Sequence, residues 1–167
     1  LDRGRPLIRP YSARWPTLPV LPMSLLGRHQ VGNAAVAVRL LEAICARGLS
    51  LTAEAVERGL SDARWPARLE WLRMPQGDLL IDAAHNPAGA EALASYLQDT
   101  GGPPLPVVLA AMQDKDVEGM VRPLTPATVR RTAAYNGVRG SRSWSFSSRW
   151  SSEARLPPRA SVCCVDN

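Results

Sequence analysis

The sequence predicts an α/β fold in which helices flank a mostly parallel, doubly wound sheet. Two short apolar runs, DLLID at residues 78–82 and VVLA at residues 107–110, have the length of buried strands and lie between turn residues. Each run is followed by a few polar residues and then by a helical pattern. Because strands that alternate with helices in this way usually pair in parallel, the pattern favours a parallel sheet with helical crossovers.

Two helices are predicted before the sheet. Residues 1–24 are rich in proline and arginine, which is typical of an extended linker or of the end of a preceding domain. Residues 29–47 are alanine-rich and apolar on most faces, so they predict a largely buried helix that stops near Gly48. A second helix is predicted after Thr52, whose side chain can cap its first turn.

The sheet region begins with RLEWLRM at residues 68–74, which alternates enough to predict a strand before the turn that leads to DLLID. Asn86 can cap the next helix with Pro87 at its first position, and this helix is expected to reach about Gln98. After VVLA, the pattern predicts a short helix over 117–124 and one further strand that starts in 127–133.

The chain changes character after about residue 134. Residues 135–167 contain eight serines and five arginines and lack helical or strand periodicity. One interpretation is a disordered, low-complexity tail. The other is a reading-frame shift, because shifted GC-rich codons often encode Ser, Arg, Pro, Trp and Cys. Sequencing the locus distinguishes them, since a βαβ pattern in another frame supports the shift and a clean stop excludes it.

Composition narrows the class of protein. A chain of 167 residues with 46% hydrophobic content can form one domain with a proper core, and it has no apolar run long enough to span a membrane. The start carries neither an initiator Met nor an apolar signal region, so we expect a chain joined part-way through a longer protein. Three cysteines, two of them adjacent, favour a reducing, cytoplasmic setting over a disulfide framework.

The net charge of +5 is mostly a property of the tail. Residues 133–167 contain five arginines and two acidic side chains, a net of +3, and residues 1–132 contain 15 basic and 13 acidic side chains, a net of +2. The region before the tail has no basic stripe with interleaved aromatic residues, which phosphate backbones require, so nucleic-acid binding is not expected.

Polar residues follow both predicted buried strands. Residues 82–86 come after the first strand and residues 113–116 after the second. Ligands of open parallel sheets bind outside the carboxyl ends of the strands, and the helix starting near Pro87 would direct its free N–H groups to this edge. The spacing therefore predicts a site for a polar ligand, and a phosphate-bearing one would fit.

Each of these side chains also has a purely structural interpretation. Asp82 can close a turn, His85 can be structural, and Asn86 is explained as a helix cap. A buried amide inside a helix needs partners, so Asn33 is harder to explain as structural. The remaining candidates can be a surface arginine (Arg68), helix caps (Asp114, Asp116) and a small core residue (Cys45).

Four blocks taken together are more specific than any one residue. They are LLGRHQVGNAAVAV (25–38), RWPARLEW (64–71), LLIDAAHNP (79–87) and QDKD (113–116). In this order and spacing the chain resembles the folylpolyglutamate synthase/dihydrofolate synthase family of the Mur ligase superfamily over roughly residues 20–132. The resemblance implies a truncated, Rossmann-type domain like the C-terminal domain of Mur ligases over 65–133. The helical end of a central domain would then occupy 25–64, after a linker or the end of the ATPase domain in 1–24.

The resemblance implies an ATP- and Mg²⁺-dependent, cytoplasmic ligase that adds L-glutamate to folates, and in bifunctional members to dihydropteroate, through an acyl phosphate. ATP contacts would fall on Asn33, Arg68 and Asp82, and His85 would hold the incoming glutamate or the acyl-phosphate region. Lys115 would be catalytic beside it, and Asp116 would lie on the glutamate side. The intact enzyme is expected to be a monomer.

Two departures from the family pattern are Ala67 and Ala83, which stand where glycine is common. No Gly-x-x-x-x-Gly-Lys-[Ser/Thr] phosphate loop occurs in the sequence. That loop and the metal ligands are expected on a preceding domain, so the 167 residues alone are expected to be inactive.

Two other functions stay open. A peptidoglycan-type Mur ligase shares the architecture, although Gly-x-His-Gln at residues 27–30 and the short block at 65–68 favour the folate branch. A non-catalytic nucleotide-binding or interaction module is the third interpretation, and salt-dependent nucleic-acid binding that is lost on deleting 134–167 would support it.

Overall fold

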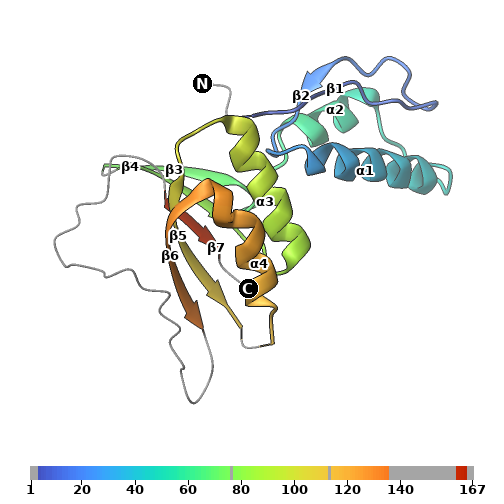
Figure 1. Cartoon of the computed structure of the whole chain (residues 1–167). Coiled ribbons are helices and arrows are strands. Elements are labelled where there is room, and N and C mark those ends of the chain that lie inside the picture. Colours follow the sequence, from blue (N-terminus) through green and yellow to red (C-terminus); the bar gives the residue numbers. More distant parts are fainter. Residues whose placement is uncertain (1–3, 76, 113, 136–160, 165–167) are drawn as a thin grey trace. The chain divides into compact units, whose positions relative to one another are not determined.

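The computed structural model describes residues 4–75, 77–112, 114–135 and 161–164 (Figure 1). The chain divides into two compact units, Leu1–Trp65 and Pro66–Asn167. The sequence placed this division between residues 64 and 65. Within the described residues, no helix has the length and apolar character needed to cross a membrane.

The first unit contains strands β1 (Leu7–Ile8) and β2 (Leu21–Pro22), which pair antiparallel, and helices α1 (His29–Cys45) and α2 (Ala53–Ser61). Thr52 caps α2 as predicted, because its Oγ1 accepts a hydrogen bond from the Ala55 N–H at 3.2 Å. Gly48 lies just after α1 with a φ of 107°, which fits the predicted stop.

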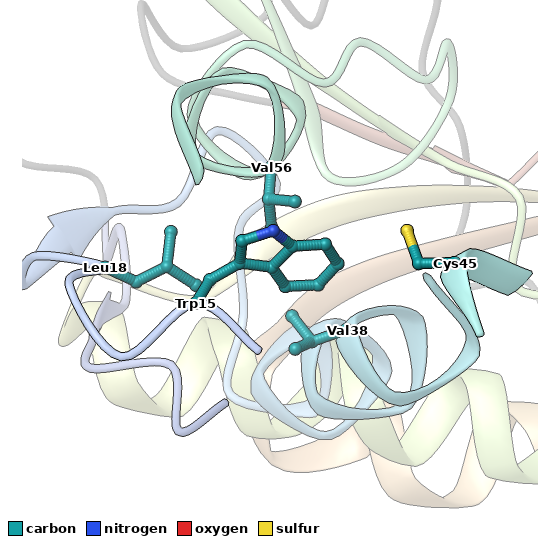
Figure 2. Packing of buried hydrophobic residues seen from close by; sticks show 5 residues of the cluster. All are labelled: Trp15, Leu18, Val38, Cys45 and Val56. Atoms are coloured by element: carbon teal, nitrogen blue, oxygen red, sulfur yellow. The ribbon is translucent and has the colours of Figure 1, made fainter. Parts of the chain in front are cut away.

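The proline-rich start of the chain packs into this unit. Figure 2 shows the Trp15 indole between the side chains of Val38 on α1 and Val56 on α2. The indole Nε1 donates to the carbonyl of Leu51 at 3.1 Å, and the Trp15 N–H donates to Ser12 Oγ at 3.0 Å. The segment before α1 therefore supplies core residues as well as a connection.

The prediction that α1 is largely buried is wrong within the described chain. Its buried positions lie mainly along one face (Gln30, Ala34, Val38 and Cys45). The side chains of Val36 and Leu40 are 60% and 58% exposed. A helix that is apolar on most faces can be covered on any of them, and the composition does not say which faces have a neighbour.

The second unit is built on a five-stranded sheet in the order β3-β4-β7-β5-β6. Strands β3 (Glu70–Met74) and β4 (Gly77–Asp82) pair antiparallel. Strand β7 (Ser161–Cys164) is parallel to β4 and to β5 (Leu105–Ala111), and β6 (Thr128–Tyr135) is parallel to β5. The predicted, mostly parallel α/β sheet is thus confirmed.

Strand β7 lies in the part of the chain predicted to be a tail. Its backbone lies between β4 and β5, with Cys163 beside both Ile81 and Val108. The run SVCC is only four residues long and carries no alternating pattern, so no strand was predicted there. Residues 136–160 and 165–167 lie outside the described residues, and the two interpretations of the tail concern mainly these.

Helices α3 (Pro87–Thr100) and α4 (Val117–Leu124) connect β4 to β5 and β5 to β6, the last through a short 3-10 turn, η1 (Thr125–Ala127). The two helices pack against each other on one face of the sheet (Figure 1). Leu80 of β4 and Met120 of α4 are fully buried. The Trp71 indole N–H donates to the buried Tyr96 hydroxyl at 2.8 Å, which ties β3 to α3.

Candidate active site at the carboxyl edge of the sheet

Asp82 is the last residue of β4, and only 7% of it is exposed. Its Oδ1 accepts a hydrogen bond from the Ala84 N–H at 2.9 Å, and its Oδ2 accepts one from the Leu69 N–H at 3.0 Å. Each carboxylate oxygen can accept more than one hydrogen bond. The residue therefore closes the turn after β4, as the structural interpretation held.

The segment that Asp82 holds, residues 67–69, has an unusual backbone. Ala67 and Leu69 have φ angles of 57° and 50°, in the left-handed region that favours glycine. Arg68 lies between them and is exposed. The departure from the family pattern at Ala67 thus falls at a position whose conformation glycine adopts at lower cost.

His85 lies after β4, is exposed, and places its Nδ1 3.1 Å from the carbonyl oxygen of Ala83. A carbonyl only accepts, so Nδ1 carries the proton in this geometry and the neutral ring keeps a lone pair on Nε2. That Nε2 is 3.5 Å from Asn86 Nδ2, which is a long contact. The ring can therefore accept a proton or a hydrogen bond at this edge.

Helix α3 begins as predicted. Asn86 Oδ1 accepts from the Gly89 N–H at 2.8 Å, and Pro87 is the first helical residue. The fit is close, because a Cβ on Gly89 would approach the Ala84 Cα to 3.2 Å. The predicted cap and the predicted proline position are both confirmed.

Lys115 and Asp116 lie after β5, at the same edge of the sheet. Asp116 caps α4 through a hydrogen bond from the Gly119 N–H to its Oδ1 at 2.9 Å. The half-buried Lys115 has its Nζ 3.6 Å from Asp114 Oδ2. A Cβ on Gly119 would meet Pro87 Cγ at 2.9 Å, so the first turns of α3 and α4 touch. The two predicted polar segments are therefore brought to one edge.

Asn33 lies in the other unit. It is exposed on α1, where its Nδ2 donates to Gln30 Oε1 at 2.9 Å. The expectation of a buried amide is therefore wrong, because this side of α1 is not covered within the described residues. The predicted contact of Asn33 with ATP therefore rests on the family resemblance alone.

Sequence reasoning missed Glu70, the first residue of β3. Its Oε2 accepts from the Ala67 N–H at 2.8 Å, while the Ala67 carbonyl accepts from the Ala83 N–H at 2.7 Å. The available indication in the sequence was Ala67 at a position where glycine is common. An alanine with positive φ is unfavourable, so a neighbouring group is needed to hold that conformation. Among the described residues, no group of three His, Cys, Asp or Glu side chains is placed to hold a metal ion.

The family model for the Mur ligase, glutamate ligase domain matches residues 67–159, more than half of the chain and past the predicted domain end at residue 133. The sheet and its polar edge thus define a ligase domain of the Mur type. The chain is 38% identical to the dihydrofolate synthase/folylpolyglutamate synthase of Mycobacterium tuberculosis over 118 residues, which are 69% of the chain and 24% of that protein.

Solved structures agree with this. The M. tuberculosis folylpolyglutamate synthase complexed with ADP aligns with a TM-score of 0.63 and 33% identity, over 75% of this chain and 28% of that one. A Yersinia pestis folylpolyglutamate synthase/dihydrofolate synthase complexed with AMPPNP and a Mn ion aligns with a TM-score of 0.61 and 25% identity, over 79% and 36%.

The chain belongs to the family of the Mur ligase, glutamate ligase domain, and the relatives that it matches are folylpolyglutamate and dihydrofolate synthases. It spans about a quarter of the length of the M. tuberculosis relative.

Proposed function

We propose that this chain forms the glutamate-ligase part of an enzyme that adds L-glutamate to folates. In the proposed reaction a folate carboxylate oxygen takes the γ-phosphoryl group of ATP, and ADP leaves. The glutamate nitrogen then attacks the acyl carbon, loses a proton, and displaces inorganic phosphate. The observation that carries the proposal is the edge at which Asp82, His85 and the Arg68 segment emerge beside the touching first turns of α3 and α4.

The nucleotide roles fall on the residues held by the turn after β4. Arg68 would supply a fixed positive charge to the phosphates, because a guanidinium stays protonated at every relevant pH. Asp82, which lies at the carboxyl end of β4, would accept from ribose hydroxyls. The ATP contact that the resemblance implies for Asn33 stays a prediction.

The acceptor roles fall on the segments after β4 and β5. His85 Nε2 would accept a hydrogen bond or a proton from the incoming amine. Lys115 would stabilise the charge that develops on the acyl phosphate, and Asp116, which caps α4, would lie on the glutamate side. A divalent ion, Mg²⁺ in this proposal, would neutralise charge on the phosphates, held by residues outside this chain.

A chimera tests the substrate class. The segment of the M. tuberculosis relative that matches this chain would be replaced by the corresponding residues of this chain. The chimera should join glutamate to a folate with MgATP, and Arg68→Ala should raise its KM for ATP. A folded chimera that binds MgATP but accepts only a nucleotide-linked sugar would instead favour the peptidoglycan-type ligase.

The purified 167-residue chain gives a second test. We expect it to bind ADP without turning over ATP, because its sequence lacks the phosphate loop. Glutamate-dependent ATP turnover by the chain alone would contradict this. A cytoplasmic location and a monomeric intact enzyme remain predictions, and the nucleic-acid alternative depends on residues 134–167, most of which lie outside the described residues.

A further inference from the structure

The backbone on both sides of Arg68 is held in an unfavourable conformation. Ala67 and Leu69 are the non-glycine residues with positive φ among those the structure describes. Such conformations persist only where the surroundings over-determine them, and they concentrate at functional sites. Leu69 is 2% exposed and anchors the segment, whereas Arg68 between the two is exposed.

Two carboxylates hold this segment through the main chain. Glu70 Oε2 accepts from the Ala67 N–H at 2.8 Å, and Asp82 Oδ2 accepts from the Leu69 N–H at 3.0 Å. The Ala67 carbonyl accepts from the Ala83 N–H at 2.7 Å, which closes the segment onto the residue after Asp82. The N–H groups on either side of Arg68 are thus both bound to charged acceptors, which form stronger hydrogen bonds than neutral ones.

The register of the sheet explains why Glu70 can do this. Glu70 pairs with Ile81, so it lies across from the residue that precedes Asp82. The two carboxylates therefore reach the segment from neighbouring strands. Asp82 already has a role in the proposed site, whereas Glu70 has none.

We propose that Glu70 is a positioning residue, which holds the turn at Ala67–Leu69 and thereby places Arg68 for an anionic ligand at the carboxyl edge. The proposal rests on the proposed function for the identity of that ligand, a nucleoside diphosphate or triphosphate. In a positioning role Glu70 acts only through Arg68. A residue that contacts the ligand itself would act independently of Arg68.

A double-mutant cycle on the 167-residue chain separates these roles. ADP affinity would be measured by calorimetry for wild type, Glu70→Ala, Arg68→Ala and the double variant. We expect Glu70→Ala to weaken ADP binding about fivefold to tenfold, which is the size of one ordinary hydrogen bond. The double variant should bind no more weakly than Arg68→Ala, because Glu70 has nothing left to position.

Amide hydrogen exchange provides a readout that does not need the nucleotide. In Glu70→Ala the Ala67 amide should exchange about tenfold faster, because its acceptor is gone. Glu70→Gln keeps a neutral acceptor and should show a smaller increase, about twofold to threefold. Amides in the middle of α3 should not change, and Glu91→Ala, an exposed acid on α3, is the matched control.

The outcomes are distinguishable. If Glu70→Ala weakens ADP binding equally in the Arg68→Ala background, Glu70 contacts the ligand and the positioning role is overturned. An unchanged exchange rate of the Ala67 amide in Glu70→Ala also overturns the positioning role. If Glu70→Ala does not fold, the same measurement on Glu70→Gln decides. If wild type fails to bind ADP, the proposed nucleotide role fails, and the exchange rates still decide whether Glu70 holds the turn.

Discussion

At the residue scale, Ala67 gives a test of backbone strain. Its φ of 57° costs an alanine about 1–2 kcal/mol, and glycine avoids this cost. Glycine also has a more flexible unfolded state, which removes part of the gain. We therefore expect Ala67→Gly to raise the free energy of unfolding by about 0.5–1 kcal/mol in equilibrium urea unfolding.

The matched control for this prediction is Ala92→Gly, inside α3 of the same unit. There the backbone is helical, so the same substitution should lower the free energy of unfolding by about 1 kcal/mol. Opposite signs for one chemical change would establish the strain at Ala67. A loss of stability at both positions would contradict it.

Asp82 gives a second test at this scale. In Asp82→Asn one side-chain oxygen is replaced by an amide N–H₂, which would face a backbone N–H donor, Leu69 or Ala84. One of two buried donors then loses its acceptor, and we expect a loss of about 1–3 kcal/mol in urea unfolding. Glu91→Gln, an exposed acid on α3, should stay close to wild type. An unchanged free energy of unfolding in Asp82→Asn would show that the carboxylate does not hold the turn.

Which contacts of the site could be predicted depended on sequence distance. Asn86 and Thr52 were correctly predicted as caps, because each binds an N–H three residues later in the chain. Asp82 binds Leu69, which is 13 residues away, and no local pattern reports a contact made across a strand pair. Glu70 accepts from the N–H of a residue three positions earlier in the chain, whereas a helix cap accepts from a residue that follows it, so the capping pattern did not predict this contact.

At the scale of elements, α1 shows where the pattern of apolar residues misleads. Val36 and Val38 belong to the same apolar run, yet Val38 is 2% exposed and Val36 is 60% exposed. Periodicity marks apolar positions correctly but does not show which of them have a packing partner. The predicted helix is present, and the prediction that it is largely buried is wrong for the described residues.

The same pair of valines gives a matched prediction. Val38→Ala removes atoms that pack against Trp15 and Val56, so we expect it to lower the free energy of unfolding by about 1–3 kcal/mol. Val36→Ala should change it by less than about 0.5 kcal/mol, because the side chain is mostly in solvent and alanine favours a helix. Urea unfolding of the 167-residue chain measures both, and equal effects would show that the face carrying Val36 is covered in solution.

At the scale of the whole molecule, the alternation of strands and helices was sufficient to predict a parallel α/β sheet. Each strand–helix–strand connection consists of consecutive residues, so its pattern can be read from the local sequence. The neighbours within the sheet were not predictable. Strand β7 lies between β4 and β5 although more than 75 residues separate β4 from β7, and its run of four residues carries no periodic signal. Strand β7 pairs in parallel with β4 on one side and with β5 on the other, and neither pairing is visible in the local sequence.

Charge adds a consequence for the chain's stability in acid. The chain carries a net charge of +5, and acid raises it further as carboxylates gain protons. The hydroxyl of Ser12, which donates to Glu42 at 2.6 Å, and the guanidinium of Arg39 hold the pKa of Glu42 below its ordinary value. Because Ser12 also accepts the Trp15 N–H, this carboxylate supports the core of the first unit.

A carboxylate whose pKa is lower in the folded state stabilises the fold above its unfolded pKa, and that contribution is lost as the pH falls through the folded value. We therefore expect wild type to lose more stability than Glu42→Gln between about pH 5 and pH 3, the window around the ordinary pKa of a glutamate. Urea unfolding at several pH values in this range measures the difference. Ser12→Ala should flatten the dependence in the same way, because it removes the largest cause of the lowered pKa. Parallel pH curves for wild type and Glu42→Gln would show that the Ser12–Glu42 contact does not form in the folded state.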